Sequence, residues 1–528
     1  MIETERHLAA LCCTLIGKNA RLSKAERILV PRHSSISTRT LTSIRKQIRA
    51  GLDPLGDIFC TIRSAEARRG QGATYTPLSI VDAMLAWATQ EEVEPVRIVD
   101  PGAGTGRFIL AAAKRFPRAQ LVAVEIDPLA ALMLRANAAV LKVGNRLTVE
   151  LSDYRTLKLP QVDGPTLFIG NPPYVRHHDI EPQWKAWLGD AAHQLGFTAS
   201  GLAGLHIHFF VRTRQIARPG DFGAFITAAE WMDVNYGSVL RHMLADGLGG
   251  TALHVIDPKA RPFADAMTTG AITCFRVGNR PSQLTVRTVD SLDKLAPLTD
   301  GRAIEWNEVQ ALPRWSVLIR QGRERRSGEI EVGELFRVHR GQVTGCNAAW
   351  IAGPEAANLP ARFLFPAITK ARDLLSAGAS LDDAAVLKRV IDLPVDLDEL
   401  TAEERRAVER FLKWAKTLEA DKSFVAKQRR AWWAVQLRAP APILCTYMAR
   451  RAPAFVRNHA GARHLNIAHG LYPLQPMSEA TLDALAQHLM TTVSTSGGRT
   501  YAGGLVKFEP GEISRLHIPE PSTIGLAT

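Results

Sequence analysis

The tetrapeptide Asn-Pro-Pro-Tyr at positions 171–174 directly follows an apolar run and combines groups that suit chemistry at an amine. Asn171 carries a side-chain amide oxygen, and Pro172 contributes a backbone carbonyl oxygen. Two such acceptors can hold the hydrogens of an exocyclic aromatic amine and pull its delocalised nitrogen toward tetrahedral geometry. Pro172 and Pro173 fix the backbone, and Tyr174 can stack on the aromatic ring that carries the amine. These residues therefore predict a site that activates an amino group.

A glycine-rich turn lies upstream, in the segment Ile-Val-Asp-Pro-Gly-Ala-Gly-Thr-Gly-Arg-Phe at 98–108. An apolar strand ends in Asp100, and Gly102, Gly104 and Gly106 precede an apolar helix. Glycines let the backbone approach a ligand closely, and a helix N-terminus supplies amide groups. The spacing Gly-x-Gly-x-Gly differs from the Gly-x-Gly-x-x-Gly of dinucleotide-binding loops. A sulfonium cofactor needs no pyrophosphate cradle but does need carboxylates for its amino group, so the turn favours such a cofactor over a nicotinamide dinucleotide.

Acidic residues also end the next two apolar runs. Glu125 ends the run 121–125, where a carboxylate can accept both hydroxyls of a ribose. Asp153 follows the run 147–151 and can accept from an adenine amino group. Because the carboxyl ends of parallel strands meet at one edge of a sheet, these carboxylates and Asp100 predict one binding site for S-adenosylmethionine.

A doubly wound α/β sheet must position these residues. From residue 73 to about 277, short apolar runs alternate with helical stretches, the rhythm of such a sheet. The expected strands are residues 97–100, 121–125, 147–151, 166–169, 223–227, 252–256 and 271–277. Residues 278–328 read as a linker with some strand and end in an exposed charged cluster at 320–326.

The two ends of the chain differ from this central region. Residues 1–72 carry 13 Lys and Arg against 6 Asp and Glu, a net charge of +7. One or two helices with a Ser/Thr-rich break at 34–43 are expected there, as a solvated extension or as a DNA-contacting arm. Residues 329–528 mix aromatic, Arg and Pro residues and show long periodic helices only at 401–418 and 478–492. We therefore expect three parts: a basic N-terminal helical arm (1–72), a catalytic domain (73–328) and a mixed α+β domain (329–528).

Bulk composition narrows the class of protein. The net charge is +13 over 528 residues, which suits a polyanionic partner. The six cysteines form no Cys-x-x-Cys pair and no Cys/His ligand spacing, so we expect reduced thiols and no metal site. No apolar run approaches the ~18 residues of a membrane span. Acidic residues precede the apolar run 8–16, unlike an export signal, and a cytoplasmic protein is expected.

The motif set resembles the N6-adenine DNA methyltransferases of restriction–modification systems. The resemblance rests on Asp-Pro-Gly-Ala-Gly-Thr-Gly at 100–106 followed by Asn-Pro-Pro-Tyr at 171–174. Ala-Thr-Tyr-Thr-Pro at 73–77 resembles the family's extra cofactor motif, which implies that Thr76 and Pro77 lie near the methionine moiety. The motif order is similar to the gamma class. The resemblance to this family implies methyl transfer from S-adenosylmethionine to N6 of an adenine flipped out of duplex DNA, with Tyr174 stacked on that base.

Later segments extend the resemblance. Residues 218–226 with Ala-Glu-Trp at 229–231 resemble later sheet motifs, although the family commonly has Gly-Gly where this chain has Gly220-Asp221. Pro262-Phe263 with 269–273 resembles the segment whose aromatic residue stacks on the flipped base, which implies that role for Phe263. The specificity domain is matched by four segments: 336–346, 366–373, Trp432-Trp433 with 440–442, and 499–504. We expect a monomer in a prokaryotic cytoplasm with double-stranded DNA as its partner, and the sequence leaves open whether a cognate restriction endonuclease exists.

Other functions remain open at this point. Asn-Pro-Pro-Tyr also occurs in enzymes that methylate glutamine side chains, and cytosine N4 enzymes more often have Ser at the Asn171 position. A non-catalytic DNA-binding assembly subunit would keep the fold, but the set Asp100, Glu125, Asp153 and Asn171 favours catalysis. The chain lacks the Pro-Cys motif of cytosine C5 enzymes, which argues against that class. The basic arm has no Asp…Glu-x-Lys nuclease pattern.

Overall fold

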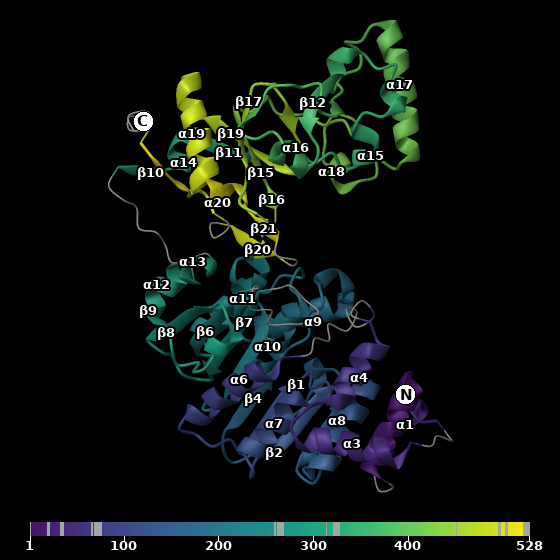
Figure 1. Ribbon diagram of the computed structural model, residues 1–528, viewed down its shortest axis with the longest axis vertical. Coiled ribbons are helices and arrows are strands. Elements are labelled where there is room, and N and C mark those ends of the chain that lie inside the picture. The colour runs from purple at the N-terminus through teal and green to yellow at the C-terminus, as the bar shows by residue number, and fades with distance from the viewer. Residues whose placement is uncertain are drawn as a thin grey trace. The chain divides into compact units, whose positions relative to one another are not determined.

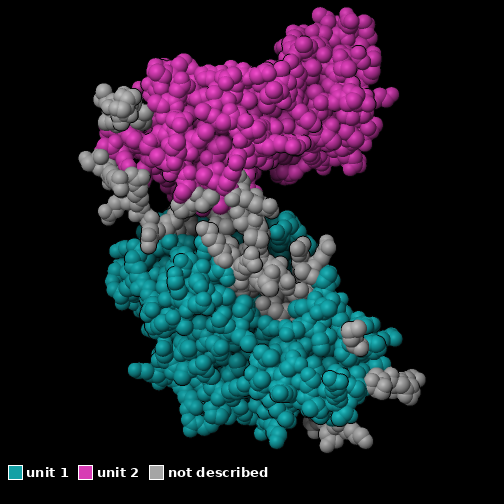
Figure 2. Space-filling view, viewed as in Figure 1, with its two compact units in different colours: residues 1–322 teal, residues 323–528 magenta. Residues whose placement is uncertain are grey.

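A computed structural model of the protein describes residues 2–17, 22–31, 36–64, 67, 76–257, 260, 269–312, 314–319, 328–449, 451–494, 498–501 and 505–520. The chain divides into two compact units, residues 1–322 and 323–528 (Figure 2). Among the described residues, no helix is both long enough and apolar enough to cross a bilayer. All six cysteines are free thiols.

The first unit is built on a nine-stranded sheet in the order β3-β2-β1-β4-β5-β7-β6-β8-β9 (Figure 1). The five strands from β3 to β5 in that order are parallel, whereas β7 runs antiparallel to β5 and β6. The strands are β1 (Arg97–Pro101), β2 (Gln120–Glu125), β3 (Leu147–Leu151), β4 (Thr166–Gly170), β5 (Phe222–Ala228), β6 (Gly250–Ile256), β7 (Gly270–Arg276), β8 (Gln283–Val289) and β9 (Arg302–Glu305).

This sheet confirms the predicted fold class. Each of the seven predicted strands is present, with ends within two residues of those expected. The segment 278–328, expected as a linker with some strand, contributes β8 and β9 to the same sheet, where Leu284 and Val286 are buried in the core. The chain reverses its direction of travel across the sheet between β1 and β4, and ligands of open α/β sheets bind at such a switch point.

Helices cover both faces of the sheet because apolar side chains point alternately to each face. Ile98 packs in the cluster with α6 (Leu78–Gln90) and α7 (Arg107–Arg115). Its neighbour Val99 packs in the opposite cluster, with α9 (Pro182–Gln194), α10 (Leu205–Ile216) and α11 (Ser238–Ala245). The unit ends with α12 (Trp306–Ala311) and α13 (Ser316–Ile319).

The N-terminal segment belongs to the same compact unit. Its helices pack on α8 (Pro128–Leu141) through a cluster that includes Leu8, Ile44 and Met133. They are α1 (Glu5–Ile16), α2 (Lys24–Leu29), α3 (Thr38–Arg49) and α4 (Pro54–Ile62). The expected Ser/Thr-rich break at 34–43 is partly helical, because the Ser37 side chain accepts from the Thr40 amide and starts α3.

The second unit combines several small sheets with two long helices. Its main sheet has the order β11-β19-β15-β17-β13, and a second has the order β14-β12-β18. These strands are β11 (Phe336–Arg340), β12 (Leu364–Ile368), β13 (Ser380–Leu381), β14 (Arg389–Ile391), β15 (Ile443–Thr446), β17 (Phe455–Asn458), β18 (Arg463–His464) and β19 (Ala468–Pro473). The two predicted long helices are present as α17 (Ala402–Thr417) and α19 (Glu479–Thr492), so the expected mixed α+β character is confirmed.

The smaller elements of the second unit complete it. Strand β10 (Glu329–Glu331) pairs with β22 (His517–Pro519), and β21 (Leu505–Lys507) pairs with both β16 (Met448–Ala449) and β20 (Arg499–Tyr501). The short helices are α14 (Val332–Leu335), α15 (Asn347–Trp350), α16 (Ala371–Leu375), α18 (Phe424–Lys427) and α20 (Pro510–Ser514).

Candidate active site

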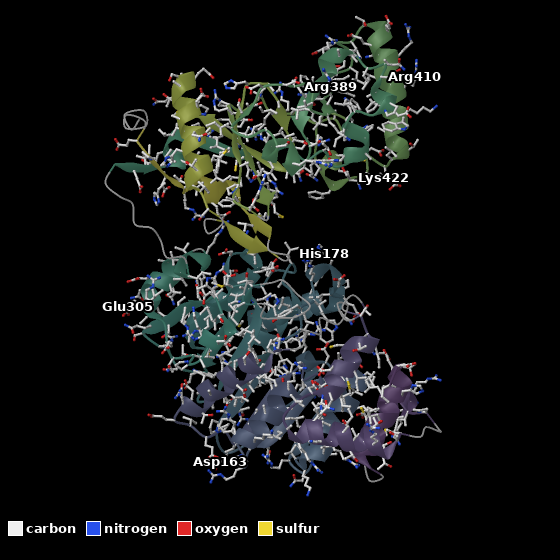
Figure 3. The ribbon with its side chains drawn as sticks, in the orientation of Figure 1. Asp163, His178, Glu305, Arg389, Arg410 and Lys422 are labelled. Atoms are coloured by element: carbon white, nitrogen blue, oxygen red, sulfur yellow. The ribbon has the colours of Figure 1, made fainter. Side chains whose placement is uncertain are left out.

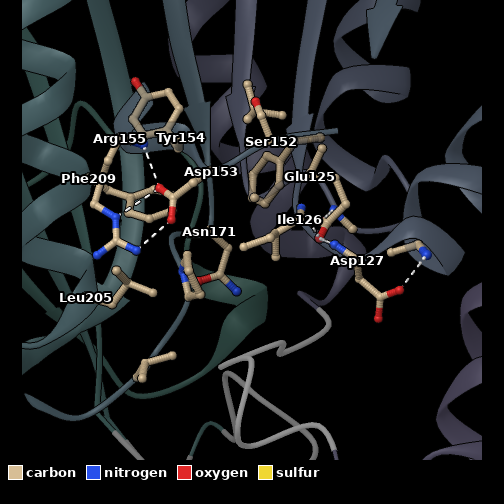
Figure 4. Close-up of a pocket in the computed structure, with 18 of the residues that line it drawn as sticks. Glu125, Ile126, Asp127, Ser152, Asp153, Tyr154, Arg155, Asn171, Leu205 and Phe209 are labelled. Atoms are coloured by element: carbon tan, nitrogen blue, oxygen red, sulfur yellow. Dashed lines mark hydrogen bonds and ion pairs between the residues drawn. The ribbon is translucent and has the colours of Figure 1, made fainter. Parts of the chain in front are cut away.

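The carboxyl ends of β1, β2, β3 and β4 surround a pocket of about 410 Å³ (Figure 4). Its lining includes seven predicted site residues: Thr76, Gly102, Gly104, Glu125, Asp153, Asn171 and Pro173. Aromatic side chains line the same pocket, namely Phe59, Phe108, Tyr154, Trp184 and Phe209. The sheet edge therefore brings the cofactor-type and amine-type motifs of the sequence into one cavity, at the switch point.

The glycine turn adopts a backbone conformation that residues with side chains rarely adopt. Gly102, Gly104 and Gly106 have φ of 75°, 54° and 92°, in the left-handed region that favours glycine. The amides of Gly102 and Ala103 both donate to the Val124 carbonyl at 2.9 Å. The Gly104 amide donates to Glu125 Oε2 at 2.7 Å. Three amides of the turn are thus used inside the protein rather than presented to an anion.

Asp100 lies beneath the turn rather than in the pocket lining. Its side chain is 1% exposed, and Oδ2 accepts from the Ile109 amide in the first turn of α7 at 3.1 Å. Burial, with the neighbouring Glu125, raises the pKa of Asp100 to about 8. This carboxylate therefore contacts the helix that follows the turn through Oδ2, while its buried Oδ1 has no hydrogen-bond partner among the described residues.

Glu125 reaches the pocket from the end of β2. Its Oε1 accepts from the amides of Ile126 and Asp127, both at 2.8 Å. The pKa of Glu125 is raised because the carboxyl is buried, and the hydrogen bonds from the amides of Asp127 and Gly104 offset part of that rise. Asp127, which the motif analysis did not single out, also lines the pocket and caps α8 through the Leu129 amide at 2.8 Å. The local network therefore fixes the orientation of two carboxylates at this wall.

Asp153 is held by a residue that the sequence analysis missed. Arg155 Nε donates to Asp153 Oδ1 at 2.9 Å, and Nη2 donates to Oδ2 at 2.6 Å (Figure 4). The Arg155 guanidinium lies over the Trp184 ring of α9, with 3.7 Å from Cζ to the ring centroid. Its buried Nη1 has no hydrogen-bond partner among the described residues. A bidentate ion pair and a cation–π contact thus form one wall of the pocket.

The Asn171 amide is oriented by contacts on both sides. Its Nδ2 donates to Thr76 Oγ1 at 3.0 Å, and its Oδ1 accepts from the Tyr174 hydroxyl at 2.7 Å. The Thr76 side chain is 4% exposed. The hydrogen bond between Asn171 and Thr76 joins the segment 171–174 to the segment 73–77, which resembles the family's extra cofactor motif. An amide held at both groups presents its oxygen in a fixed direction.

The remaining predicted residues lie around this arrangement. Pro173 packs on the glycine turn, since a Cβ built at Gly102 would lie 3.4 Å from its Cδ. Pro172 is buried, and Pro77 stands at the start of α6. The Tyr174 ring packs against the cluster around α6 and α7, and burial raises the pKa of its hydroxyl. Pro77, Asp100, Gly106, Pro172 and Tyr174 are outside the pocket lining. Phe263 lies outside the described residues.

An ion pair ties the N-terminal helices to the site. Arg107, the first residue of α7, donates through Nε to Asp53 Oδ2 at 2.9 Å and through Nη1 to the Thr76 carbonyl at 2.9 Å. The Thr105 hydroxyl donates to the same Asp53 oxygen at 2.6 Å. Asp53 itself caps α4 through the Gly56 amide. The Asp-Pro capping pattern at 53–54 was readable from the sequence, but its partner 54 positions away was not.

Comparison with known proteins identifies the family. The family described as "Type II methyltransferase M.Eco57I, C-terminal domain" matches residues 319–526, and "Eco57I restriction-modification methylase" matches residues 161–257. The chain is 54% identical over 520 residues to Type II methyltransferase M.XamI of Xanthomonas campestris pv. amaranthicola, which covers 98% of each chain. The chain belongs to the type II methyltransferases of restriction–modification systems. The resemblance drawn from the sequence motifs is confirmed at this level.

More distant relatives span the methyltransferase as well. Type II methyltransferase M.AccI of Acinetobacter calcoaceticus is 23% identical over 86% of each chain. The solved structure of the type IIG restriction endonuclease BpuSI matches with a TM-score of 0.50 and 15% identity, over 98% of this chain and 70% of that one. This structural likeness supports the fold alone. A release factor glutamine methyltransferase of Mycolicibacterium smegmatis is 32% identical, but over only 24% of this chain.

Proposed function

We propose that the methyltransferase transfers a methyl group from S-adenosylmethionine to the N6 amino group of an adenine in double-stranded DNA. The observation that carries this proposal is the Asn171 amide, anchored between Thr76 and Tyr174 at the wall of the pocket. The net charge of +13 supports a DNA substrate. We propose a location in the prokaryotic cytoplasm, because that is where the DNA substrate lies.

The residues of the pocket fit an adenosyl sulfonium. A volume of about 410 Å³ is within the ~300–1,000 Å³ range of small-molecule sites. The lining holds more carboxylates than cations, with Glu125, Asp127, Asp153, Asp179 and Glu181 against Arg107 and Arg155. A cationic cofactor suits that balance, whereas a pyrophosphate does not. The glycine-turn amides also favour a cationic cofactor over a pyrophosphate, because they donate to Val124 and Glu125 within the protein.

We assign the pocket residues to parts of the cofactor accordingly. Glu125 would accept the ribose hydroxyls, and Asp153 would accept from the adenine amino group, with the Nη1 of Arg155 as a neighbouring donor. Thr76 and Pro77 would lie at the methionine end. Gly102, Gly104 and Gly106 give the backbone its close approach, and Asp100 supports them by holding α7. When bound, S-adenosylmethionine supplies an electrophilic methyl group on sulfur.

The protein's part in the reaction is positioning and polarisation. The oxygens of Asn171 and Pro172 accept the two hydrogens of the target amine, which localises its lone pair on nitrogen. Pro173 holds this turn against Gly102, so that amine and cofactor sites keep one relative position. When bound, the cofactor would supply its methyl group to this nitrogen and leave as S-adenosylhomocysteine, and the surplus amine proton would pass to solvent. No covalent enzyme intermediate is required, because holding reactants in line lowers the barrier directly.

Extrusion of the base must be offset by contacts in the pocket. Flipping costs a few kcal/mol, and stacking on one aromatic side chain contributes ~1–3 kcal/mol. We propose Tyr174 and Phe263 as the stacking residues. Because the Tyr174 hydroxyl donates to Asn171, the entering amine has to share or replace that hydrogen bond.

The parts of the chain divide the work in this proposal. Residues 73–328 catalyse, residues 329–528 recognise the target sequence, and the basic residues of 1–72 add attraction to DNA. The enzyme acts as a monomer beside a cognate restriction endonuclease. Exchange of residues 329–528 with those of a relative would test the division, since the methylated sequence is expected to follow the exchanged part.

Identification of the methylated product tests the proposed reaction. The purified protein is incubated with DNA and S-adenosylmethionine labelled in the methyl group, and the DNA is digested to nucleosides. We expect the label in N6-methyl-2′-deoxyadenosine. Label in N4-methylcytosine, or in added release factor protein rather than in DNA, would replace this proposal with one of its two rivals.

A further inference from the structure

The second unit carries a cluster of basic and aromatic side chains from its main sheet and from the sheet β14-β12-β18, called here the arginine patch. Its members come from β11, β12, β18, β19 and the loop before β15: Arg337, His339, Phe365, Arg438, Arg463 and Tyr472. Three of the stretches singled out in the sequence, at 336–346, 366–373 and 440–442, contribute to it or adjoin it. The fold therefore gathers separate motifs of the second unit at one place.

The patch is built on the pairing of β11 with β19. Arg337 stands directly opposite Tyr472 in the antiparallel register. The rings of His339 and Tyr472 meet edge to face, with centroids 5.6 Å apart. Gly470 lies opposite His339, and a Cβ built there would be 2.7 Å from Ala441 Cβ and 2.9 Å from Tyr472 Cε2. Only glycine permits this close approach, which seats the Arg438 loop on the sheet.

The loop before β15 holds Tyr472 and the guanidinium of Arg463 in place. The Tyr472 hydroxyl donates to the Ala439 carbonyl at 2.7 Å. Arg463 donates to the Arg438 carbonyl, and its guanidinium lies over the Phe365 ring, with 5.1 Å from Cζ to the centroid. A guanidinium fixed in this way gives up little conformational entropy when it binds an anion.

The charge of the patch is uncompensated within the described part of the chain. Arg337, Arg438 and Arg463 form no ion pair with a described carboxylate, although other arginines of the unit do, such as Arg457 with Asp483. Burial lowers the pKa of His339, and the nearby Arg438 and Arg337 lower it further. Arg337 and Arg438 are exposed, and Arg463 is partly exposed. Like charges held together at the surface favour a polyanionic ligand.

We propose that the arginine patch binds backbone phosphates of the duplex that the enzyme methylates. This inference rests on the proposed function only in that DNA is the substrate. Fixed guanidinium groups match phosphate geometry, and phosphate contacts set the register of a protein on its site without reading the sequence. The patch then positions the second unit on DNA while other residues of that unit distinguish the bases.

A charge-removal experiment with a matched control tests the proposal. The test variant combines Arg337→Gln, Arg438→Gln and Arg463→Gln. The control variant combines Arg406→Gln, Arg410→Gln and Lys413→Gln, three exposed positions of α17. Arg410 is labelled in Figure 3, away from β11 and β19 in the shared orientation of Figure 1. Both variants have the same formal charge. Thermal unfolding and binding of S-adenosylhomocysteine confirm that each is folded.

The measurement is the dissociation constant for duplex DNA at several salt concentrations. For the test variant, the slope of log affinity against log salt is expected to fall by roughly one for each phosphate that the patch no longer neutralises, equally for target and unrelated duplexes. The control keeps a slope closer to that of the wild type. Equal slopes for the test variant and the control would overturn the proposal, as would weaker binding confined to the target sequence. The nucleosides methylated by the wild type are scored separately, so failure of the adenine assignment leaves this result readable.

Discussion

The side-chain nitrogen of Asn171 donates to the Thr76 hydroxyl across 3.0 Å, although 95 positions separate the two residues. Thr76 precedes the helix α6, and Asn171 follows the strand β4. The contact therefore links the segment expected at the methionine end of the cofactor to the segment expected to hold the amine. It also fixes which group of the amide faces the Tyr174 hydroxyl.

Replacement of Asn171 by alanine is predicted to abolish methyl transfer while cofactor binding persists. The variant lacks the oxygen that polarises the amine, an interaction used only as the nitrogen becomes tetrahedral. Removal of one such preorganised group typically lowers the rate ~10²–10³-fold. Single-turnover methylation measures the rate, and calorimetry with S-adenosylhomocysteine measures binding. Failure of both together would indicate misfolding, and an unchanged rate would remove Asn171 from the mechanism.

Thr76→Val tests the anchor of that amide. The valine has nearly the same shape but no hydroxyl oxygen to accept from Asn171, and a hydrogen bond of this kind contributes about 1 kcal/mol. We expect methylation to slow by about five- to tenfold. Thr76→Ser, which keeps the hydroxyl, is the matched control and is expected to stay near the wild-type rate. A decrease confined to Thr76→Ser, with Thr76→Val near the wild-type rate, would mean that the methyl group of Thr76, rather than its hydroxyl, is important.

Arg155→Gln tests the ion pair with Asp153. The substitution removes two charge-assisted hydrogen bonds to the carboxylate and the stacked guanidinium that holds it. We expect the dissociation constant for S-adenosylhomocysteine to rise about tenfold, which corresponds to ~1.4 kcal/mol. Arg118→Gln removes an exposed ion pair with Glu94 and is expected to have no effect on binding. Tighter binding by Arg155→Gln would show instead that Arg155 competes with the cofactor for Asp153.

Asp100 predicts a pH dependence of stability. Its pKa is raised to about 8 in the folded protein, compared with ~3.9 in an unfolded chain. The folded state thus binds more protons between these values, so the stability contributed by Asp100 is complete below ~3.9 and is lost as the pH rises toward 8. Asp100→Asn keeps an acceptor for the Ile109 amide but does not titrate.

The corresponding measurement compares thermal unfolding of Asp100→Asn and the wild type at about pH 5 and about pH 8. The midpoint of the variant is expected to rise relative to that of the wild type as the pH rises. A difference that stays constant, or that moves the other way, would show that Asp100 is ionised in the folded protein.

The sheet and its strand ends were predictable because their signals are local. Apolar runs, glycine spacing and terminal carboxylates occur within a few residues of one another, and the order of parallel strands then brings Gly104, Glu125, Asp153 and Asn171 to one edge. Some strand was expected within 278–328, but the bounds of β8 and β9 and their places in the sheet were not predicted. Their sequence is compatible with a linker until the neighbouring β6 is known.

The support of the site could not be predicted in the same way. Arg155 pairs with Asp153 at a spacing of two residues, but only the position of Trp184 explains why its guanidinium folds back. Asp53 at the start of α4 and Arg107 at the start of α7 form an ion pair that no local pattern encodes. The hydrogen bond that Asp100 accepts from the Ile109 amide was not predicted either. In each case a tertiary contact decides where a charged side chain points.

The central claim is tested most directly in a host that expresses the chain. DNA from cells with the wild-type enzyme and with Asn171→Ala is sequenced by a method that distinguishes methylated bases. We expect N6-methyladenine at nearly every copy of one short sequence with the wild type, and at none with the variant. Methylated cytosine at that sequence, or unmodified DNA despite a folded and cofactor-binding wild-type protein, would contradict it.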